Sequence, residues 1–332
     1  MINETVLTFG ENPPAQPTTL GMTDGQAAAI VPVLVYWSLC VMFELIEQFG
    51  LFQKHKIYPT EEEQKKNIAP KGQVIRYVMI QQTVQVIFAL IVTSWEDEKP
   101  VPDDAFGQIQ YFKGLLRSFH FLQPMEVSIL AWCLRGTWLA VRQFAAFFVY
   151  DFWSYIVHYV EHNNQYIYKH IHSRHHHLYN PYSWGTLYNH PLEGFYLDTV
   201  GAYFGKAAAG LSHREATFFF TLATTKGTSD HCGYDLPFDP FRVFGYLSGN
   251  GLYFHNVHHQ SWGLKTNFAL YFTFWDRFFN TMYLGSRPLV AKKAAEKEMR
   301  QGVAVDFSND PVPTEVSSEV LRERKPLNRI PE

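Results

Sequence analysis

The feature that most constrains the fold is the length of the uncharged apolar runs. Residues 27–43 contain no charged side chain, and the apolar character continues to residue 52 past Glu44 and Glu47. As a helix, this run is long enough to cross a hydrocarbon core about 30 Å thick. Residues 74–94 contain a second run, uncharged from Tyr77 onward. The sequence therefore predicts a helical integral membrane protein.

The second run contains three glutamines at near-helical spacing, which we expect to face a neighbouring helix rather than lipid: Gln81, Gln82 and Gln85. A third apolar helical pattern covers residues 127–150 and is expected to continue to His162, which is longer than a bilayer requires. Arg135 and Arg142 share one face of this helix, where they either pack against other helices or snorkel to the interface.

Residues 195–225 are apolar but interrupted by charges and glycines, and they are too few for two spans. They predict a shallow hairpin that enters and leaves on one side of the membrane. Together these segments predict an all-α integral membrane protein. It has about three spans, a re-entrant or interfacial helical hairpin and a cytosolic helical cap that holds a histidine-rich dimetal site.

The charges of the loops predict the orientation. The loop at residues 53–76 carries six basic residues and is placed in the cytosol: Lys54, Lys56, Lys65, Lys66, Lys71 and Arg76. The acidic loop at residues 95–125 then lies on the other side, with the N-terminus and its glycosylation sequon at Asn3. No Lys or Arg precedes Lys54, so no cleavable signal peptide is expected.

Composition excludes several classes of protein. A net charge of −3 and a pI near 6.6 argue against nucleic acid as a partner. The chain has three cysteines, without the spacing of a disulfide framework or a CxxC zinc site: Cys40, Cys133 and Cys232.

We predict three regions. Residues 1–125 form an N-terminal membrane region with spans at about 27–52 and 74–94, residues 126–285 form the catalytic domain, and residues 286–332 form a polar cytosolic tail. The tail is expected to be partly disordered, with an exposed helix at residues 291–301.

The histidines are clustered at spacings that suit metal binding. His158 and His162 form an HxxxH pair on one face of the long helix. Two HxxHH motifs follow: His172, His175 and His176, then His255, His258 and His259. Each cluster can direct neutral imidazole nitrogens to one point, as transition metals require. Because one ion takes four to six ligands, eight clustered histidines predict a pair of metals.

Further residues are candidates to complete the site. His190 and His231 lie in the region needed to supply additional ligands. Asp151 shares the face of His158 and is expected to accept the N–H of a metal-bound imidazole; its alternative role is solvation of the helix end. Asp230, Glu193 and Asp235 are further carboxylates of this kind, whereas Glu161 lies off the shared face. We expect His177 to face solvent or to contact the metal-binding imidazoles without binding the metal. The isolated His55, His120 and His213 are expected to lie in exposed loops.

These motifs resemble the fatty acid hydroxylase and sterol desaturase superfamily, whose histidines hold a non-haem diiron centre. The surrounding sequence resembles the branch that hydroxylates sphingolipid long-chain bases, over roughly residues 126–285. The segments that carry this resemblance are YKHIHSRHHH (168–177), YNHPLEGFYLDTVG (188–201), SDHCGYDLP (229–237), FHNVHHQ (254–260) and FWDRFFN (274–280).

The resemblance implies a monooxygenase that uses two iron ions and O2 to hydroxylate carbon 4 of a long-chain sphingoid base or dihydroceramide. It implies electrons from NADH through cytochrome b5 and its reductase. The chain has no HPGG haem motif, so a separate cytochrome b5 is expected as partner. Membrane lipid and other enzymes of sphingolipid synthesis are further expected partners. The expected location is the endoplasmic reticulum membrane, with the active site facing the cytosol.

Two alternatives remain open at this point. A sister oxidase or desaturase acting on 4-methyl sterols would use the same histidines. A non-redox protein would instead hold zinc in them. Zinc can also replace iron in preparations of an iron enzyme, because imidazole binds both metals. Four aromatic residues are candidates to line the channel for the lipid chain, with ordinary packing as the alternative for each: Trp184, Tyr188, Phe195 and Tyr196. We expect His172→Ala or His258→Ala to abolish oxidation.

Overall fold

The structure, a computed structural model, describes residues 21–58, 65–96, 105–260 and 263–283. In these residues every regular element is helical, and the one β contact is an isolated antiparallel bridge between Lys56 and Tyr234. Three predicted features lie outside the described residues: the sequon at Asn3, the helix at residues 291–301 and the tail at residues 286–332. The helical class predicted from the sequence is confirmed.

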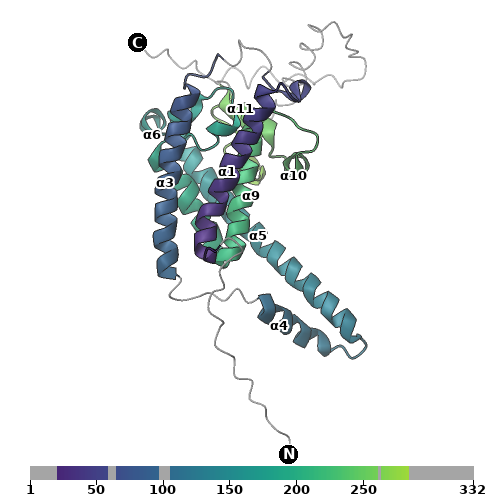
Figure 1. Cartoon of the computed structure of the whole chain (residues 1–332). Helices are drawn as coiled ribbons and strands as arrows, with labels where there is room; N and C mark the ends of the chain where they lie inside the picture. The colour runs from purple at the N-terminus through teal and green to yellow at the C-terminus, as the bar shows by residue number, and fades with distance from the viewer. Residues whose placement is uncertain (1–20, 59–64, 97–104, 261–262, 284–332) are drawn as a thin grey trace, which may run out of the picture. The chain divides into compact units, whose positions relative to one another are not determined.

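Five long helices are joined by short helical segments (Figure 1). The long helices are α1 (Asp24–Gln48), α3 (Lys71–Glu96), α4 (Ala105–Arg117), α5 (Pro124–Asn163) and α9 (His213–His231). The shorter α-helices are α6 (Gln165–His170), α7 (Pro191–Glu193), α8 (Gly201–Ala208), α10 (Pro240–Ser248), α11 (Leu252–His259) and α12 (Phe274–Phe278). The remaining segments are the 3-10 helices η1 (Gln53–His55), η2 (His172–His177) and η3 (Ser183–Gly185), and the π-helix η4 (Gly194–Val200).

Among the described helices, two are long and apolar enough to cross a membrane, α1 and α3 up to Trp95. Apolar side chains such as Leu34 and Met42 on α1 and Ile87 and Ile91 on α3 remain exposed. A core helix of a water-soluble protein would bury most of its apolar side chains, so this exposure suits contact with lipid.

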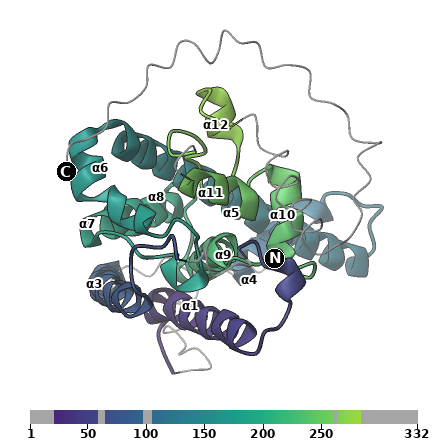
Figure 2. The same ribbon diagram turned by 90° about the horizontal axis from the view of Figure 1, so that it is seen from above.

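Polar contacts between helix ends fix the directions of α1, α3 and α9. Arg214 at the start of α9 pairs with Asp24 at the start of α1 at 3.2 Å, and Tyr234 beyond the end of α9 donates to Glu47 near the end of α1. These two helices therefore run parallel, side by side in Figures 1 and 2. Lys71 at the start of α3 reaches Glu44 at 2.7 Å, so α3 runs in the opposite direction.

The three glutamines of α3 face other helices, as predicted. Gln82 accepts a hydrogen bond from the Trp37 indole of α1 at 2.6 Å. Gln81 donates to Asp198 at 3.2 Å, and Gln85 donates to the Gly194 carbonyl at 3.0 Å, both in η4. Because these amides bond to protein groups, α3 can carry them within an apolar segment.

A helical hairpin forms where the sequence predicts one. Its first arm consists of η4 and α8, and its second arm is α9, which begins at the N-cap Ser212 in a capping box with Glu215. Arg142 of α5 holds the turn, since its Nε donates to the Ala209 carbonyl at 3.0 Å and its Nη1 pairs with Glu215 at 3.0 Å. Of the two roles considered for Arg142, packing against other helices is therefore the observed one.

Helix α5 is continuous over 40 residues, as its length in the sequence predicts. Its first half lies along α4, and its second half packs against α8 and carries His158 and His162 (Figure 1). Asp151 ties α5 to the chain after α11, because its carboxylate accepts the backbone N–H groups of Leu270, Tyr271 and Phe272 at 2.9, 2.7 and 3.2 Å.

The basic loop between α1 and α3 packs on the histidine-bearing segments. The backbone N–H of Ile57 donates to the Gly233 carbonyl at 2.9 Å, and that of Ile68 donates to the His177 carbonyl at 2.8 Å. The Tyr58 hydroxyl donates to Asn256 of α11 at 3.0 Å. The described parts of this loop and the histidines therefore lie at the same end of the bundle.

Candidate metal centre and substrate cavity

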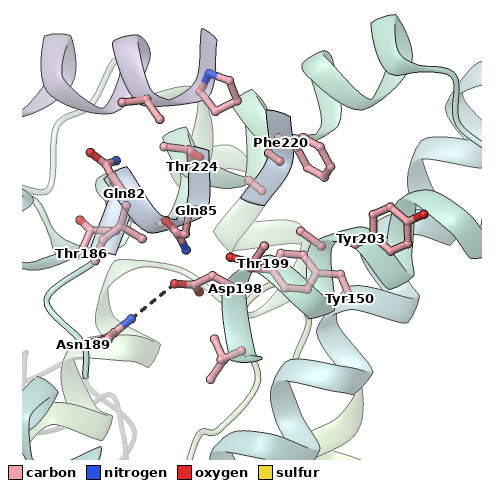
Figure 3. Close-up of a pocket in the computed structure, with 18 of the residues that line it drawn as sticks. Gln82, Gln85, Tyr150, Thr186, Asn189, Asp198, Thr199, Tyr203, Phe220 and Thr224 are labelled. Atoms are coloured by element: carbon pink, nitrogen blue, oxygen red, sulfur yellow. Dashed lines mark hydrogen bonds between the residues drawn. The ribbon is translucent and has the colours of Figure 1, made fainter. Parts of the chain in front are cut away.

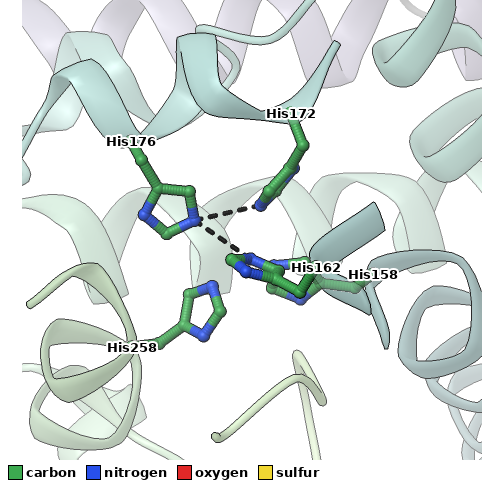
Figure 4. A group of neighbouring side chains, drawn as sticks. All are labelled: His158, His162, His172, His176 and His258. Atoms are coloured by element: carbon green, nitrogen blue, oxygen red, sulfur yellow. Dashed lines mark hydrogen bonds between the residues drawn. The ribbon is translucent and has the colours of Figure 1, made fainter. Parts of the chain in front are cut away.

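Nine histidines from four elements meet in two groups inside the protein. Within each group the ligand nitrogens lie within 4.8 Å of one another. The first group, drawn in Figure 4, contains His158, His162, His172, His176 and His258, and the second contains His175, His231, His255 and His259. Of the nine, eight are buried and His176 is partly buried. Helix α5, segment η2 and helices α9 and α11 supply them.

Each HxxHH motif divides between the two groups. In η2, His172 and His176 belong to the first group and His175 to the second; in α11, His258 belongs to the first and His255 and His259 to the second. Successive residues of a helix point about 100° apart, so adjacent histidines cannot face one point. The expectation that one motif serves one point is therefore wrong, and each motif instead bridges the two groups.

Hydrogen bonds to backbone carbonyls fix the tautomer of four of these imidazoles. Each Nδ1 donates to a carbonyl oxygen at 2.7–2.9 Å, because a carbonyl can only accept. The pairs are His158 with Phe268, His231 with Gly227, His258 with Thr266 and His259 with Leu178. A neutral ring protonated at Nδ1 has an unprotonated Nε2, the form that binds a metal.

These unprotonated nitrogens face one another in the second group. The Nε2 atoms of His231 and His259 lie 3.0 and 2.9 Å from the Nε2 of His255, which has at most one proton to share between them. In the first group, the Nε2 atoms of His158 and His258 are buried without a hydrogen-bond partner. Converging lone pairs of this kind require a cation, so the residues present fit a pair of transition-metal ions.

Burial keeps the imidazoles neutral. It lowers the pKa of His158 and of His175 to about 4, and that of His231 to about 3. The pKa values of His172, His176, His255, His258 and His259 also lie well below the usual value, first because of burial and then because of neighbouring histidines. Neutral imidazoles can bind a metal at physiological pH without first losing a proton.

Two buried carboxylates orient His172. Its Nδ1 lies 2.8 Å from Glu193 and 3.3 Å from Glu161. Burial raises the pKa of both carboxyls, that of Glu161 to about 8, with Asp198 contributing further to both. The sequence predicts Glu193 as a carboxylate of the site but not Glu161, which lies off the face of His158. Helix periodicity gives no signal for this contact, since η2 folds back across that side of α5.

The other predicted carboxylates have different partners. Asp151 bonds to the three backbone N–H groups after Ala269 rather than to an imidazole. It acts on the centre indirectly, because the same segment supplies the Phe268 carbonyl that holds His158. Asp230 pairs with the buried Lys226, and Asp235 bonds to Tyr253 and Arg242. The expected contact between Asp230 and a ligand imidazole is therefore not formed.

His231 joins the second group, whereas His190 lies outside both groups. His190 caps α7 by accepting the backbone N–H of Leu192 at its Nδ1, 3.2 Å away. His213, expected in an exposed loop, is instead the first residue of α9 and is partly buried. Sequence spacing could not separate these cases, because all three residues stand alone rather than in a repeated motif.

A cavity of about 260 Å³ leads from the histidines into the bundle. At one end it is lined by His158, His172, His175, His231 and His255, and at the other by small or apolar residues of α1 and α3, among them Ala28, Pro32, Ala89 and Val92. Polar side chains lie between them, including Gln85, Asn189, Asp198 and Thr224 (Figure 3). The cavity thus combines a metal-binding end with space for an apolar chain.

The four aromatic residues proposed from sequence do not line this cavity. Trp184 and Tyr188 are buried in a core formed with α1 and α3. Phe195 packs against Phe88, and Tyr196 is 57% exposed. Ordinary packing, the alternative considered for them, describes Trp184, Tyr188 and Phe195. Other aromatic residues line the cavity instead, together with smaller side chains of α1, α3 and α9: Phe88, Tyr150, Tyr203, Phe220 and Tyr271.

Comparison with known proteins identifies the family. The fatty acid hydroxylase family profile matches residues 143–281. A sphingolipid C4-hydroxylase of Saccharomyces cerevisiae is 40% identical over 80% of this chain and 73% of its own length. The Schizosaccharomyces pombe protein of that name is 37% identical over 76% of this chain and 86% of its own length, and sphinganine C4-monooxygenase 2 of Arabidopsis thaliana is 38% identical over 78% and 88%.

Sterol oxidases are among the more distant relatives. No solved structure matches the chain significantly. The histidine motifs that the family resemblance rested on are the same residues that the fold gathers into the two buried groups. The chain therefore belongs to the fatty acid hydroxylase family, alongside the sphingolipid C4-hydroxylases.

Proposed function

We propose that this chain is an oxygen-dependent membrane monooxygenase that hydroxylates carbon 4 of sphinganine or dihydroceramide and gives phytosphingosine-type products. The observation that carries the proposal is the pair of buried imidazole groups at one end of a cavity whose other end is apolar. The names of the relatives specify the reaction and the position on the lipid. A sterol substrate would suit the same histidines, but sterol oxidases are the more distant relatives.

The nine grouped histidines are the ligands that we assign to two iron ions. When bound, such a pair activates O2 for insertion of one oxygen atom into an unactivated C–H bond, while the other oxygen atom leaves as water and consumes two electrons and two protons. The backbone carbonyls and Glu193 accept hydrogen bonds from the Nδ1–H groups, which leaves the Nε2 atoms free to bind the metals. His190 stays outside the assigned set because it caps α7.

The remaining task of the protein is to position the substrate. An unactivated C–H bond offers no acidic proton and no leaving group, so the choice of carbon depends on how the chain is held. The apolar walls of α1 and α3 suit the hydrocarbon tail, and the polar lining nearer the histidines suits the head group. A dry apolar cavity also limits the side reactions that water would allow.

We further propose that the enzyme faces the cytosol from the endoplasmic reticulum membrane and takes electrons from NADH through a separate cytochrome b5 and its reductase. The orientation is supported by the packing of the basic loop on the histidine-bearing segments, since such loops remain cytosolic. We expect α5 to embed as a third span, with the hairpin of η4, α8 and α9 re-entering from the cytosolic side.

The test is a mass-spectrometric profile of sphingoid bases from cells that lack 4-hydroxylated ones and express this chain. We expect new phytosphingosine with the wild type and none with His258→Ala, although the variant still inserts into the membrane. His120→Ala is the matched control, because this exposed histidine lies in the turn before α5, and it should retain the product. A membrane-inserted wild type that forms no such product with cytochrome b5 present would contradict the proposal.

A further inference from the structure

One cavity carboxylate is hydrogen-bonded only to side-chain amides among the residues that the structure describes. Three carboxylates line the cavity: Glu193, Asp198 and Asp230. Glu193 bonds to the ligand His172, and Asp230 pairs with Lys226. The Oδ2 atom of Asp198 accepts from the side-chain amides of Gln81 at 3.2 Å and Asn189 at 3.5 Å. Asp198 forms no ion pair with any residue that the structure describes.

The surroundings make an isolated negative charge costly. Asp198 lies in η4, which packs between α3 and α5, and its partly buried side chain lines the cavity (Figure 3). Lys206, the cationic side chain of the cavity lining, is eight residues further along η4 and α8, or about 12 Å of helical rise. A carboxylate in such a place is stabilised by a cation that hydrogen-bonds to it.

Asp198 is also close to the metal end of the cavity. Its negative charge contributes to the raised pKa of Glu161 and of Glu193, the two carboxyls beside the Nδ1 of His172. It shares the cavity lining with His172 and His175. In a sphingoid base the amino group stands on carbon 2, two carbons from the carbon to be oxidised. A residue that binds this amine must therefore lie near the metals, as Asp198 does.

We propose that Asp198 binds the protonated amine of the substrate and makes the enzyme selective for the free sphingoid base over its N-acylated form. This inference rests on the proposed function. The ammonium supplies the cation that the cavity lacks at Asp198, and it donates hydrogen bonds to the carboxylate. In dihydroceramide the same nitrogen is a neutral amide, which leaves the charge of Asp198 uncompensated. Gln81 and Asn189 orient the carboxylate through their hydrogen bonds to Oδ2.

The experiment compares two substrates with purified, iron-loaded, full-length protein in nanodiscs. Equilibrium binding of sphinganine and of N-acetylsphinganine is measured without reductant, and kcat and KM are then measured for both with reductant. We expect Asp198→Asn to raise the Kd and KM for sphinganine roughly 30-fold or more, the loss typical of one partner of a buried charge pair. Its Kd for N-acetylsphinganine should be unchanged or lower, because the substitution removes the charge that a neutral amide leaves uncompensated.

Two variants control for damage to the fold. Asp198→Glu keeps the charge and should recover a substantial part of the sphinganine affinity. Asp235→Asn makes the same chemical change at a carboxylate outside the cavity and should leave both affinities unchanged. Metal analysis and retained binding of N-acetylsphinganine show that the Asp198→Asn protein is folded, and a variant that fails to fold is replaced by Asp198→Ser in the same comparison.

The outcomes separate this inference from the proposed function. Equal weakening of both ligands in Asp198→Asn, or wild-type affinity that is higher for N-acetylsphinganine than for sphinganine, would overturn the role of Asp198. A wild type that hydroxylates neither lipid at carbon 4 would overturn the proposed function instead. In that case, a selective loss of sphinganine binding in Asp198→Asn would still support an ammonium site at this carboxylate.

Discussion

At the scale of single residues, metal binding at this site depends on the group that accepts a hydrogen bond from the Nδ1 atom of each imidazole. His172 is the grouped histidine whose Nδ1 lies near two buried carboxylates, Glu193 at 2.8 Å and Glu161 at 3.3 Å, whereas the Nδ1 atoms of four others donate to backbone carbonyls. A carboxylate behind an imidazole raises the basicity of the coordinating nitrogen and fixes the ring. Bound metal ions would lower the raised pKa values of both carboxyls and favour their charged forms, because nine neutral imidazoles supply no negative charge.

Replacing Glu193 tests this arrangement. We expect Glu193→Ala to lower metal affinity by about 10–100-fold and to reduce activity in proportion to the metal lost, because outer partners of ligand histidines typically contribute this much. Metal titration of the purified protein measures the change directly. Asp235→Ala, which removes a carboxylate from outside the cavity, is the control and should bind metal as the wild type does. Unchanged metal affinity in Glu193→Ala would show that Glu161 alone orients His172.

At the scale of elements, the hairpin and α5 approach each other unusually closely. A Cβ atom built at Gly205 of α8 would lie 2.6 Å from the backbone carbonyl oxygen of Ala146 in α5. Backbone atoms cannot rotate away as a side chain can, so the two helices would have to separate. Their contact positions the π-helix η4, and with it Asp198, against the metal end of the cavity.

Gly205→Ala is therefore expected to destabilise the protein by about 1–3 kcal/mol, the typical cost of overpacking. Thermal unfolding in detergent, followed together with hydroxylase activity, measures the effect. Gly136→Ala is the matched control in α5, because nothing lies within 4 Å of the Cβ position there. It should be neutral or slightly stabilising, since alanine favours a helix more than glycine does. Equal destabilisation by both substitutions would refute the role of close packing at Gly205.

At the scale of the whole molecule, the metal centre connects segments that are far apart in the chain. The first group joins α5, η2 and α11, and the second joins η2, α9 and α11. Ligands from separate elements come together only in the folded state, so metal binding adds to the free energy of unfolding. Because η2 and α11 contribute to both groups, loss of either ion should loosen the same elements.

We accordingly expect two metal ions per chain, and a lower melting temperature after chelation that is restored by added Fe²⁺. His258→Ala and His259→Ala each remove a ligand from a different group and should each reduce the content toward one ion. His120→Ala should retain two. Mass spectrometry of the metal content and thermal scans with and without chelator provide the measurements. A wild type with a single ion, or with stability unaffected by chelation, would contradict a two-metal centre.

Helix periodicity and the family resemblance predicted much of the site. The spacing of the clusters at His158, His172 and His255 predicted metal ligands, and the fold gathers these residues into the two groups. The interrupted apolar run at residues 195–225 predicted the helical hairpin. Periodicity describes one helix at a time, however. It therefore could not place Glu161 beside His172, or assign Asp151 to the backbone of residues 270–272, because both contacts join segments that only the fold brings together.

The sequence by itself determined the helical class, the two membrane-spanning candidates and the identity of most histidines, since these follow from local apolar runs and local spacing. The tertiary structure decided which histidine joins which group and that His231, not His190, completes a group. It also decided that Asp198 lines the cavity with only amide partners. The physical reason is that a metal or a substrate is bound by side chains converging from several elements, and their directions are fixed only when those elements pack.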